Sequence, residues 1–330
     1  MNNLKKIGLT ALGTSLIATS AFAGSMAVTG SAGISMSNSS NASTGNSFGM
    51  TDSLTFSGSG EMDNGWNVTV SMEIENNAQD SAATTNNMDS RSVKIDMGDM
   101  GVLTFSGHGG SSAMSAIDDV TPTAYGEAWD VIGSSTTAPA VGQSTKFTSV
   151  AGGATNNSFF YSAPEMVAGL GVNLSYTPSG TGRPDGTLSY ALKYTGIEGL
   201  TVGYGQDDNG LSGSSNIEHE TAYATYAYGP ITVGIQEGES DQEASTAGDD
   251  DMSSAGITYA VTDDLTIGYN VSEYSAGDKT ADQESENVSF SYTTGGMTIA
   301  GAMIEMNNVG GSTAARDDVD GYAVDVSFAF

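Results

Sequence analysis

After residue 23, apolar and polar residues alternate along most of the chain with a period of two. Residues 65–75 read "GWNVTVSMEIE", with Asn, Thr, Ser and Glu between the apolar positions. Alternation of this kind predicts a β-strand with one apolar face and one polar face. The apolar face of this segment consists of Trp66, Val68, Val70, Met72 and Ile74. The same scheme recurs in 187–194, 200–205, 265–272 and 287–292.

Sixteen such segments follow one another, separated by Gly, Asn, Asp and Ser, and none shows a helical apolar period. The predicted strands span residues 24–37, 50–61, 65–75, 89–98, 101–108, 156–163, 171–178, 187–195, 200–208, 218–228, 231–239, 251–261, 265–275, 285–294, 297–307 and 320–330.

The connections between these segments are alternately short and long. The short ones are 63–65, 98–101, 196–200, 228–231, 262–265 and 295–296. The long ones include 39–46, 76–89, 240–251 and 307–321. Short turns on one side and long loops on the other indicate an antiparallel meander with two different ends.

A meander of sixteen two-faced strands has a packing problem. A soluble sandwich buries its apolar faces against a second sheet, and an open sheet this wide has two exposed edges. Closing the sheet removes the edges, and turning the apolar faces towards lipid satisfies every backbone group. The sequence therefore predicts an all-β fold, a 16-stranded antiparallel transmembrane β-barrel. A soluble β-solenoid is disfavoured because no fixed-period repeat is present.

The first 23 residues differ from the rest. Lys5 and Lys6 precede an apolar stretch that ends in "AFA" (21–23), the pattern of a secretory signal peptide. A membrane anchor is the alternative, but the stretch is short and contains several Thr and Ser residues. We expect cleavage after Ala23, which leaves residues 24–330 as the mature barrel domain, exported through the periplasm.

Charge narrows the range of partners. The chain has a formal net charge of −30, and loss of the two signal lysines leaves 7 basic and 39 acidic residues, a net charge of −32. A field of that sign repels phosphates, so nucleic acid is not expected as a partner. Solubility or adaptation to salt is one explanation of the charge. A surface or cavity that concentrates cations is the other.

Candidate catalytic and metal sites are few. The chain has no Cys and only two His, without zinc-ligand spacing, and no G-x-S-x-G motif, so we expect neither enzyme activity nor a cofactor. Acidic runs offer oxygen ligands for calcium, but none completes the twelve-residue calcium loop. The weak calcium candidates are Asp249, Asp250 and Asp251.

Several stretches, in their order along the chain, resemble the trimeric general porins of Gram-negative outer membranes. They are the signal ending "AFA", "GDMGVLTFSG" (98–107), "FFYSAPEMVAGLGVNLSY" (159–176) and the terminal "SFAF" (327–330). The resemblance implies a homotrimer among outer-membrane lipids that acts as a passive, water-filled diffusion channel for small hydrophilic solutes and ions. It also implies that Phe330 is an assembly signal read by the barrel-assembly machinery.

Residues 109–146 form one exceptional connection, and a loop of that length is usually functional. The resemblance implies that it folds into the barrel and narrows the pore as a constriction loop. Its acids are Asp118, Asp119, Glu127 and Asp130, and strand parity adds Lys94, Asp96, Lys193 and His108 as lumenal candidates. Arg91 has lipid-facing parity, so we expect it at the rim or beside a bulge.

General porins place a basic cluster across from the loop acids, and this chain has few basic residues. We therefore expect a preference for cations rather than a strong transverse field. The alternative function is a non-conducting adhesin or structural barrel, plugged by residues 109–146. Deletion of that loop distinguishes the two, because only a porin should then conduct more.

Overall fold

The structure is a computed structural model of the chain. It describes residues 24–40, 46–77, 88–128, 156–180, 185–211, 216–241, 249–277, 280–309 and 318–330. The predicted signal peptide and Asp130 lie outside these residues, as does much of the second half of the 109–146 connection.

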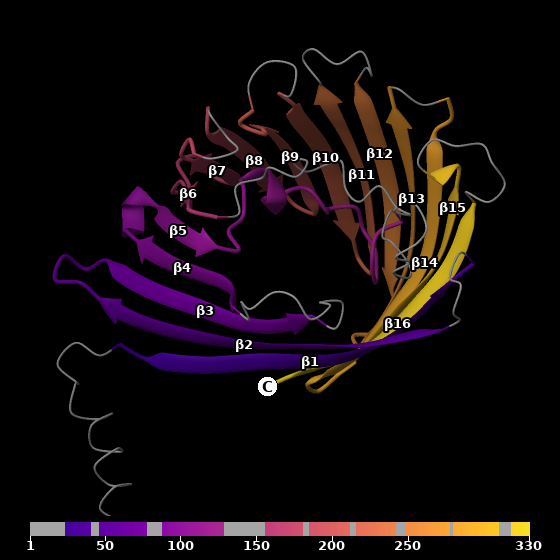
Figure 1. Ribbon diagram of the computed structural model, residues 1–330, viewed down its shortest axis with the longest axis horizontal. Coiled ribbons are helices and arrows are strands. Elements are labelled where there is room, and N and C mark those ends of the chain that lie inside the picture. Colours follow the sequence, from indigo (N-terminus) through magenta and orange to yellow (C-terminus); the bar gives the residue numbers. More distant parts are fainter. Residues whose placement is uncertain are drawn as a thin grey trace, which may run out of the picture.

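Sixteen antiparallel strands form one closed barrel, in which each strand pairs with its neighbours in the sequence and β1 pairs with β16 (Figure 1). The strands are β1 (Met26–Ser39), β2 (Ser47–Glu61), β3 (Asn67–Asn77), β4 (Met88–Asp96), β5 (Val102–His108), β6 (Ser158–Ser162), β7 (Leu170–Thr177), β8 (Thr187–Ile197), β9 (Leu200–Asp208), β10 (Glu218–Tyr228), β11 (Ile231–Asp241), β12 (Asp250–Ala260), β13 (Leu265–Ala276), β14 (Gln283–Thr294), β15 (Met297–Asn307) and β16 (Val319–Ala329). The predicted fold class is confirmed, with strand ends within a few residues of the expected ones.

Two short 3-10 turns, η1 (Gly98–Met100) and η2 (Met114–Ala116), are the only helical elements among the described residues. Within that part of the chain, no helix is both long and apolar enough to cross a membrane.

The barrel closes between the first and last strands. Their register runs from Ser31 opposite Ala329 to Ser39 opposite Gly321. The ladder continues to the last residue, because the Gly30 N–H donates to the Phe330 carbonyl at 2.9 Å and the Phe330 N–H donates to the Gly30 carbonyl at 3.0 Å. Phe330 therefore takes part in the seam.

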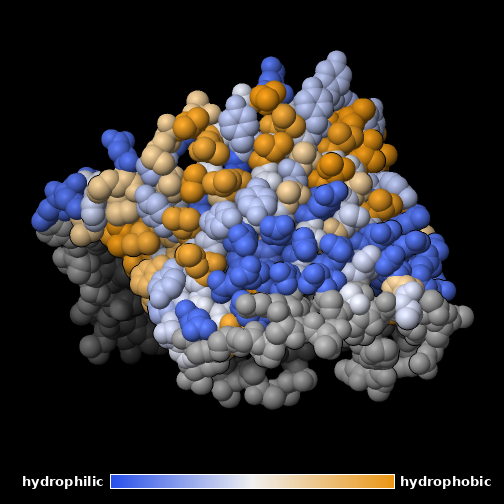
Figure 2. Space-filling model, turned by 90° about the horizontal axis from the view of Figure 1, so that it is seen from above, coloured by the Kyte–Doolittle hydropathy of each residue, from blue (hydrophilic) through white to orange (hydrophobic). Residues whose placement is uncertain are grey.

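The two faces of the wall follow the predicted alternation. On β3, the side chains of Val70, Met72 and Ile74 are exposed on the outside. Thr69, which precedes Val70, faces inward and pairs with Lys94 of β4. Figure 2 shows the outer face over the strands at the top of Figure 1, where apolar residues give way to a band of hydrophilic ones. Apolar side chains therefore cover the part of the wall that lipid would contact.

The regular pairing is interrupted near the start of β4 and the end of β5, next to the long loops. A register shift lies between Arg91 and Ser92, so that Arg91 pairs with Met72 on one side and with His108 on the other. The Arg91 side chain lies against Gly107, the residue that the shift leaves without a partner. Arg91 thus sits beside a β-bulge, as its parity suggested. The same bulge means that simple alternation does not assign a face to His108.

Candidate functional site

The connection between β5 and β6 turns inward immediately after Gly110 and runs along the inner wall. Its first anchor is Ala113, whose N–H lies 3.0 Å from both the Ser175 Oγ of β7 and the Ser189 Oγ of β8. Both serines are buried, and their hydroxyls also bond to each other. A buried backbone N–H needs a partner, and the wall provides it here.

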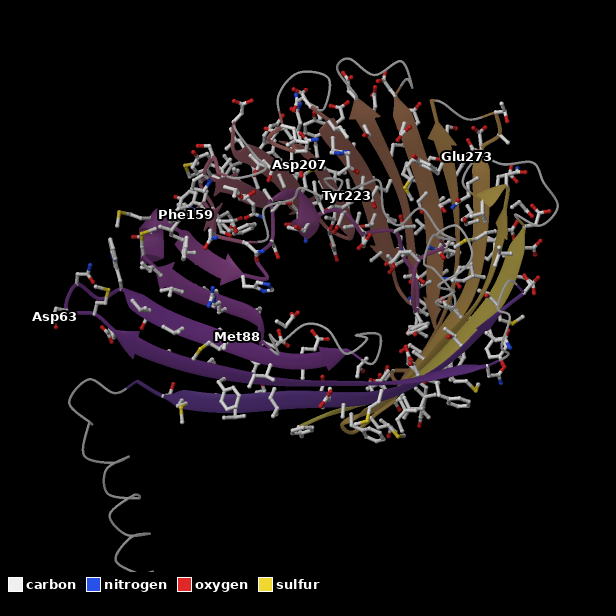
Figure 3. All side chains as sticks on the ribbon, in the orientation of Figure 1. Asp63, Met88, Phe159, Asp207, Tyr223 and Glu273 are labelled. Carbon is white, nitrogen blue, oxygen red and sulfur yellow. The ribbon has the colours of Figure 1, made fainter. Side chains whose placement is uncertain are left out.

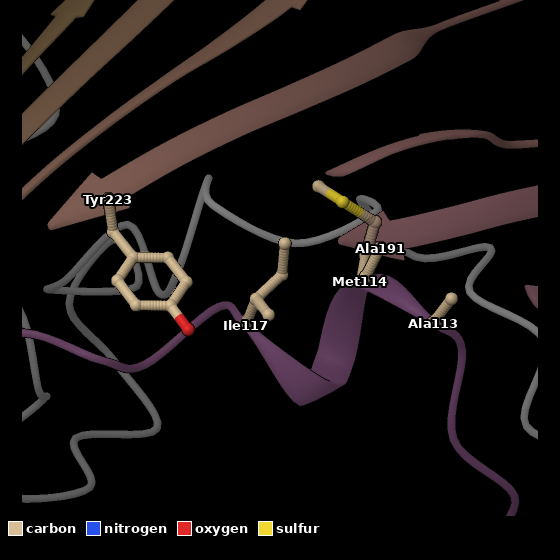
Figure 4. Close-up of a cluster of buried hydrophobic side chains, with 5 residues drawn as sticks. All are labelled: Ala113, Met114, Ile117, Ala191 and Tyr223. Carbon is tan, nitrogen blue, oxygen red and sulfur yellow. The ribbon is translucent and has the colours of Figure 1, made fainter. Parts of the chain in front are cut away.

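Apolar packing holds the next turn. Met114 and Ile117 are almost fully buried and pack against Ala191 of β8 and Tyr223 of β10 (Figure 4). The Tyr223 ring lies on the inner side of the wall (Figure 3). Complete burial of a Met or Ile side chain contributes about 1.5–3 kcal/mol. These two side chains therefore fix the loop to three adjacent strands, since Ile117 and Met114 also lie over Gly205 of β9.

Glycines on the inner face provide the space in which the loop lies. A Cβ atom on Gly205 would be 2.6 Å from Ile117 Cδ1, and one on Gly234 of β11 would be 2.6 Å from Pro122 Cδ. A Cβ on Gly256 of β12 would meet the Pro122 carbonyl oxygen, and one on Gly268 of β13 would lie 2.7 Å from the Ala124 nitrogen. Real Cβ atoms do not approach so closely. A side chain at Gly234, Gly256 or Gly268 therefore displaces the loop, and one at Gly205 displaces the ends of the Ile117 and Met114 side chains.

Wall amides and hydroxyls bond to the loop backbone. The Gln236 Nε2 of β11 donates to the Ile117 carbonyl at 3.0 Å, and Asn287 Nδ2 of β14 donates to the Gly126 carbonyl at 2.8 Å. The Ala124 N–H donates to the Ser289 Oγ at 3.1 Å. These side chains replace the water that an irregular segment would otherwise bind.

Tyr125 marks the far end of this path. Its hydroxyl donates to the Asp325 carboxylate of β16, and its ring packs against an apolar cluster on the inner face of β15. That cluster contains Ala302, Ile304 and Met306. Residues 113–126 therefore contact every strand from β7 to β16, and the predicted inward fold is confirmed for the described part of the loop.

The wall from β2 to β6 differs in its lining. The loop meets its edge, where Gly110 lies against Ser106 of β5 and Ser158 of β6 and where Phe160 of β6 packs against the Met114 and Ile117 cluster. One row of directly paired residues crosses all five strands at a single height, and every member is a serine. The row consists of Ser57, Ser71, Ser92, Ser106 and Ser158. In a ring of sixteen, strands eight apart face each other, so this wall lies across from the middle of the loop path.

The loop acids lie next to the buried anchor. Asp118 directly follows Ile117 and is half-buried, and it accepts a hydrogen bond from the Asp119 N–H at 2.9 Å. Desolvation by burial raises the pKa of the Asp118 carboxyl above its usual value. Asp119 is exposed and Glu127 is half-buried. The loop therefore carries its acidic groups along the covered side of the lumen.

The predicted basic residues are on two different parts of the wall. Lys94 of β4 pairs with Thr69 and Thr104, on the side without the loop. Asp96, two residues on, accepts a bond from the Gly98 N–H at 3.0 Å and so belongs to the turn. Lys193 of β8 pairs with Gly171 and Gly203, on one of the two strands that hold the first anchor of the loop. The structure does not bring the two lysines together.

The calcium candidates point in different directions. Asp250 faces the lumen, where the Tyr274 hydroxyl donates to it at 2.8 Å and the Gly277 N–H at 3.2 Å. Asp251 follows it on β12 and so faces outward. No group of three potential metal ligands is found among the described residues. Calcium binding stays a prediction.

Reasoning from the sequence missed most of the residues that hold the loop. Gln236, Asn287 and Ser289 look like ordinary lumenal positions, because alternation gives only their face. The inward-facing glycines of β9, β11, β12 and β13 and the apolar inner face of β15 were available signals. Both depart from a polar water-facing wall, and together they trace the path of the loop.

Comparisons with known proteins agree with this geometry. A search of curated proteins finds no match. An anion-selective porin from Comamonas acidovorans matches with a TM-score of 0.69 at 15% identity, covering 93% of this chain and 99% of that one. A triple mutant of the Rhodopseudomonas blastica porin matches with a TM-score of 0.68 at 14% identity, covering 93% and 100%. Likenesses at such identity show the fold. The family model of Gram-negative porins matches residues 8–312, so the chain belongs to the Gram-negative porin family.

Proposed function

We propose that this porin is a passive diffusion channel for small hydrophilic solutes and ions, that it prefers cations, and that it assembles as a homotrimer in the outer membrane. It performs no chemistry and couples to no energy source. The observation that carries the proposal is the path of residues 113–126 along one side of the lumen, which narrows the barrel from within.

Charge supports the cation preference. The described part of the loop brings Asp118, Asp119 and Glu127 to the lumen, and the facing wall from β2 to β4 adds a single base, Lys94. Fixed carboxylates in a narrow, low-dielectric passage attract cations and repel anions. The related Comamonas acidovorans porin is anion-selective, so the fold alone does not set the sign. The residues in the constriction decide it.

The outer face supports the trimer. On β1–β3 the outward positions described are apolar or small, apart from Asp52 and Asn38. On β10–β14 the outward positions near the long loops carry a series of carboxylates. A surface almost free of charge, next to the seam, suits contact with neighbouring copies of the chain.

Recording of the purified protein in a planar bilayer under a salt gradient tests this proposal. We expect stable ohmic conductance that closes in three equal steps, with a reversal potential on the cation side. The triple variant Asp118→Asn, Asp119→Asn, Glu127→Gln should move the reversal potential towards zero. An anion-side reversal potential would contradict the cation preference, and absence of conductance would contradict the channel itself.

A further inference from the structure

Two adjoining hollows mark the outer face of the barrel over β11–β16. The first has a volume of about 710 Å³ and spans β12–β16, within the apolar band. Its side chains are almost all apolar or aromatic, among them Ile257, Ile267, Tyr269, Val288 and Met303. Gly301 of β15 has no side chain there, and the Phe290 ring leans against its backbone. A hollow of this size and lining accommodates hydrocarbon chains.

The second hollow has a volume of about 400 Å³ and spans β11–β14, nearer the long loops. Its apolar floor is formed by Ile235, Ala255 and Val271. Its edge carries the carboxylates of Glu237, Glu273, Glu284 and Glu286, and no Lys or Arg lines it.

The two hollows are continuous along three strands, because the next outward position lies two residues along each strand. Ile257 of the apolar hollow leads to Ala255 of the acidic one, and Tyr269 leads to Val271. On β14, Val288 leads to Glu286. The Tyr269 hydroxyl donates to Glu286 Oε2 at 3.1 Å across this boundary.

The register concentrates negative charge around the upper hollow. Ser253 stands between Glu237 of β11 and Glu273 of β13, and Glu273 is directly opposite Glu284 of β14. Directly opposed like charges on a sheet repel each other. An ammonium group placed over Ser253 would be within reach of these carboxylates and would relieve that repulsion, whereas a phosphate would increase it.

We propose that the paired hollows bind one amphiphile, a lipid whose headgroup carries an ammonium group without excess negative charge. Its acyl chains lie in the apolar hollow of β12–β16, and its ammonium group lies among Glu237, Glu273 and Glu284. The proposal rests on the outer-membrane placement given above, but it concerns the lipid-facing surface and needs no conductance.

Two lipids with identical chains and headgroups of opposite charge provide the test, lysyl-phosphatidylglycerol and phosphatidylglycerol. Each is titrated into the detergent-solubilised full chain in the presence of EDTA, and bound lipid is counted by native mass spectrometry. We expect about tenfold tighter binding of the lysyl lipid, in keeping with a few partly exposed charge pairs. The double variant Glu273→Gln, Glu284→Gln should abolish that preference.

Two further variants locate the site. The double variant Glu218→Gln, Glu239→Gln removes the same charge from outward positions outside the hollow, and it should leave the preference intact. Ala255→Leu fills the floor of the acidic hollow, and it should weaken binding of both lipids.

Three results would overturn the proposal. One is equal binding of both lipids, and another is equal loss of preference in the two Glu→Gln pairs, which would indicate general surface charge. The third concerns a titration with Ca²⁺ in place of EDTA. If phosphatidylglycerol then binds more tightly than the lysyl lipid, divalent cations bridge the carboxylates and the phosphate. All variants should conduct like the parent channel, so a failure here is distinguishable from a failure of the proposed function.

Discussion

The inner wall of the barrel has two regions, β1–β6 and β7–β16, that obey the same alternation and differ in what covers them. From β2 to β6 the inward positions include an unbroken row of paired serines. From β7 to β16 they include glycines, the apolar cluster of β15 and the amides that bond to the loop. The serines of β2–β4 suit contact with water, whereas Ser106 and Ser158 are buried beside Gly110 of the loop. The second region is a binding surface for the chain's own loop.

The difference shows that a lumenal position need not be polar where the loop covers it. Under the loop, a small or apolar residue is favourable, because it permits close approach and removes apolar area from water. A stretch of the lumenal face that is less polar than its neighbours therefore indicates contact with an inward-folded loop. The sequences of the wall strands predict the path of the loop as well as the loop sequence does.

Substitution of a glycine on the inner wall should distinguish the two regions, β1–β6 and β7–β16, most strongly. A Cβ on Gly256 of β12 would overlap the Pro122 carbonyl oxygen and lie 2.8 Å from Thr121 Cγ2, so Gly256→Val must push the loop into the lumen or off the wall. Overpacking of this kind costs about 1–3 kcal/mol. We expect conductance altered by about twofold with irregular gating, measured in single-channel recordings, and faster proteolysis of the loop.

Gly33 of β1 is the matched control. It also faces inward, but a Cβ there would come within 3 Å only of the Thr51 hydroxyl, at 2.9 Å, which is the end of a side chain that can rotate. Gly33→Val should therefore leave conductance and proteolysis close to those of the parent. If Gly256→Val and Gly33→Val had equal effects, contact with the loop would not distinguish the two regions of the wall.

A smaller effect is expected from pH. Burial raises the pKa of Asp118, so this carboxyl takes up its proton at a higher pH than an ordinary Asp as the solution is acidified. The loop then loses one negative charge, and the cation-to-anion permeability ratio should fall by about twofold. Reversal potentials recorded across a pH series measure this fall.

Asp118→Asn should lower the cation-to-anion permeability ratio at neutral pH. It should also remove the fall of that ratio at the higher-pH end of the series, where Asp118 takes up its proton. Asp119→Asn, which removes an exposed carboxylate from the same loop, should lower the ratio while leaving the upper part of the pH dependence in place. If the two variants gave the same pH profile, burial of Asp118 would have no bearing on selectivity.

Most of the fold could be predicted from the sequence, because lipid outside and water inside impose period-two alternation on every strand. The strands 200–208, 218–228 and 297–307 have the bounds that the pattern predicts. The seam at Phe330 also follows, since an even number of strands brings the first and last together. Its reading by the assembly machinery is untested and stays a prediction.

Less of the candidate site could be predicted from the sequence, because the site depends on which strands the loop crosses. Parity places Lys94 and Lys193 in the lumen. It cannot say that Lys94 faces the loop path and that Lys193 lies on a strand that anchors the loop. His108 follows a bulge, which breaks the parity rule locally. Glu127 could be assigned to the loop from its position, whereas its burial could not.

The central claim is that apolar side chains cover the outside of the ring and polar side chains line a water-filled interior. The chain has no cysteine, so single cysteines can be introduced and followed without background. The most direct measurement is the reaction of Thr69→Cys and Val70→Cys with a membrane-impermeant thiol reagent in reconstituted vesicles. The account predicts fast labelling of the cysteine at 69 and protection at 70. The reverse order, or equal labelling of both, would contradict it.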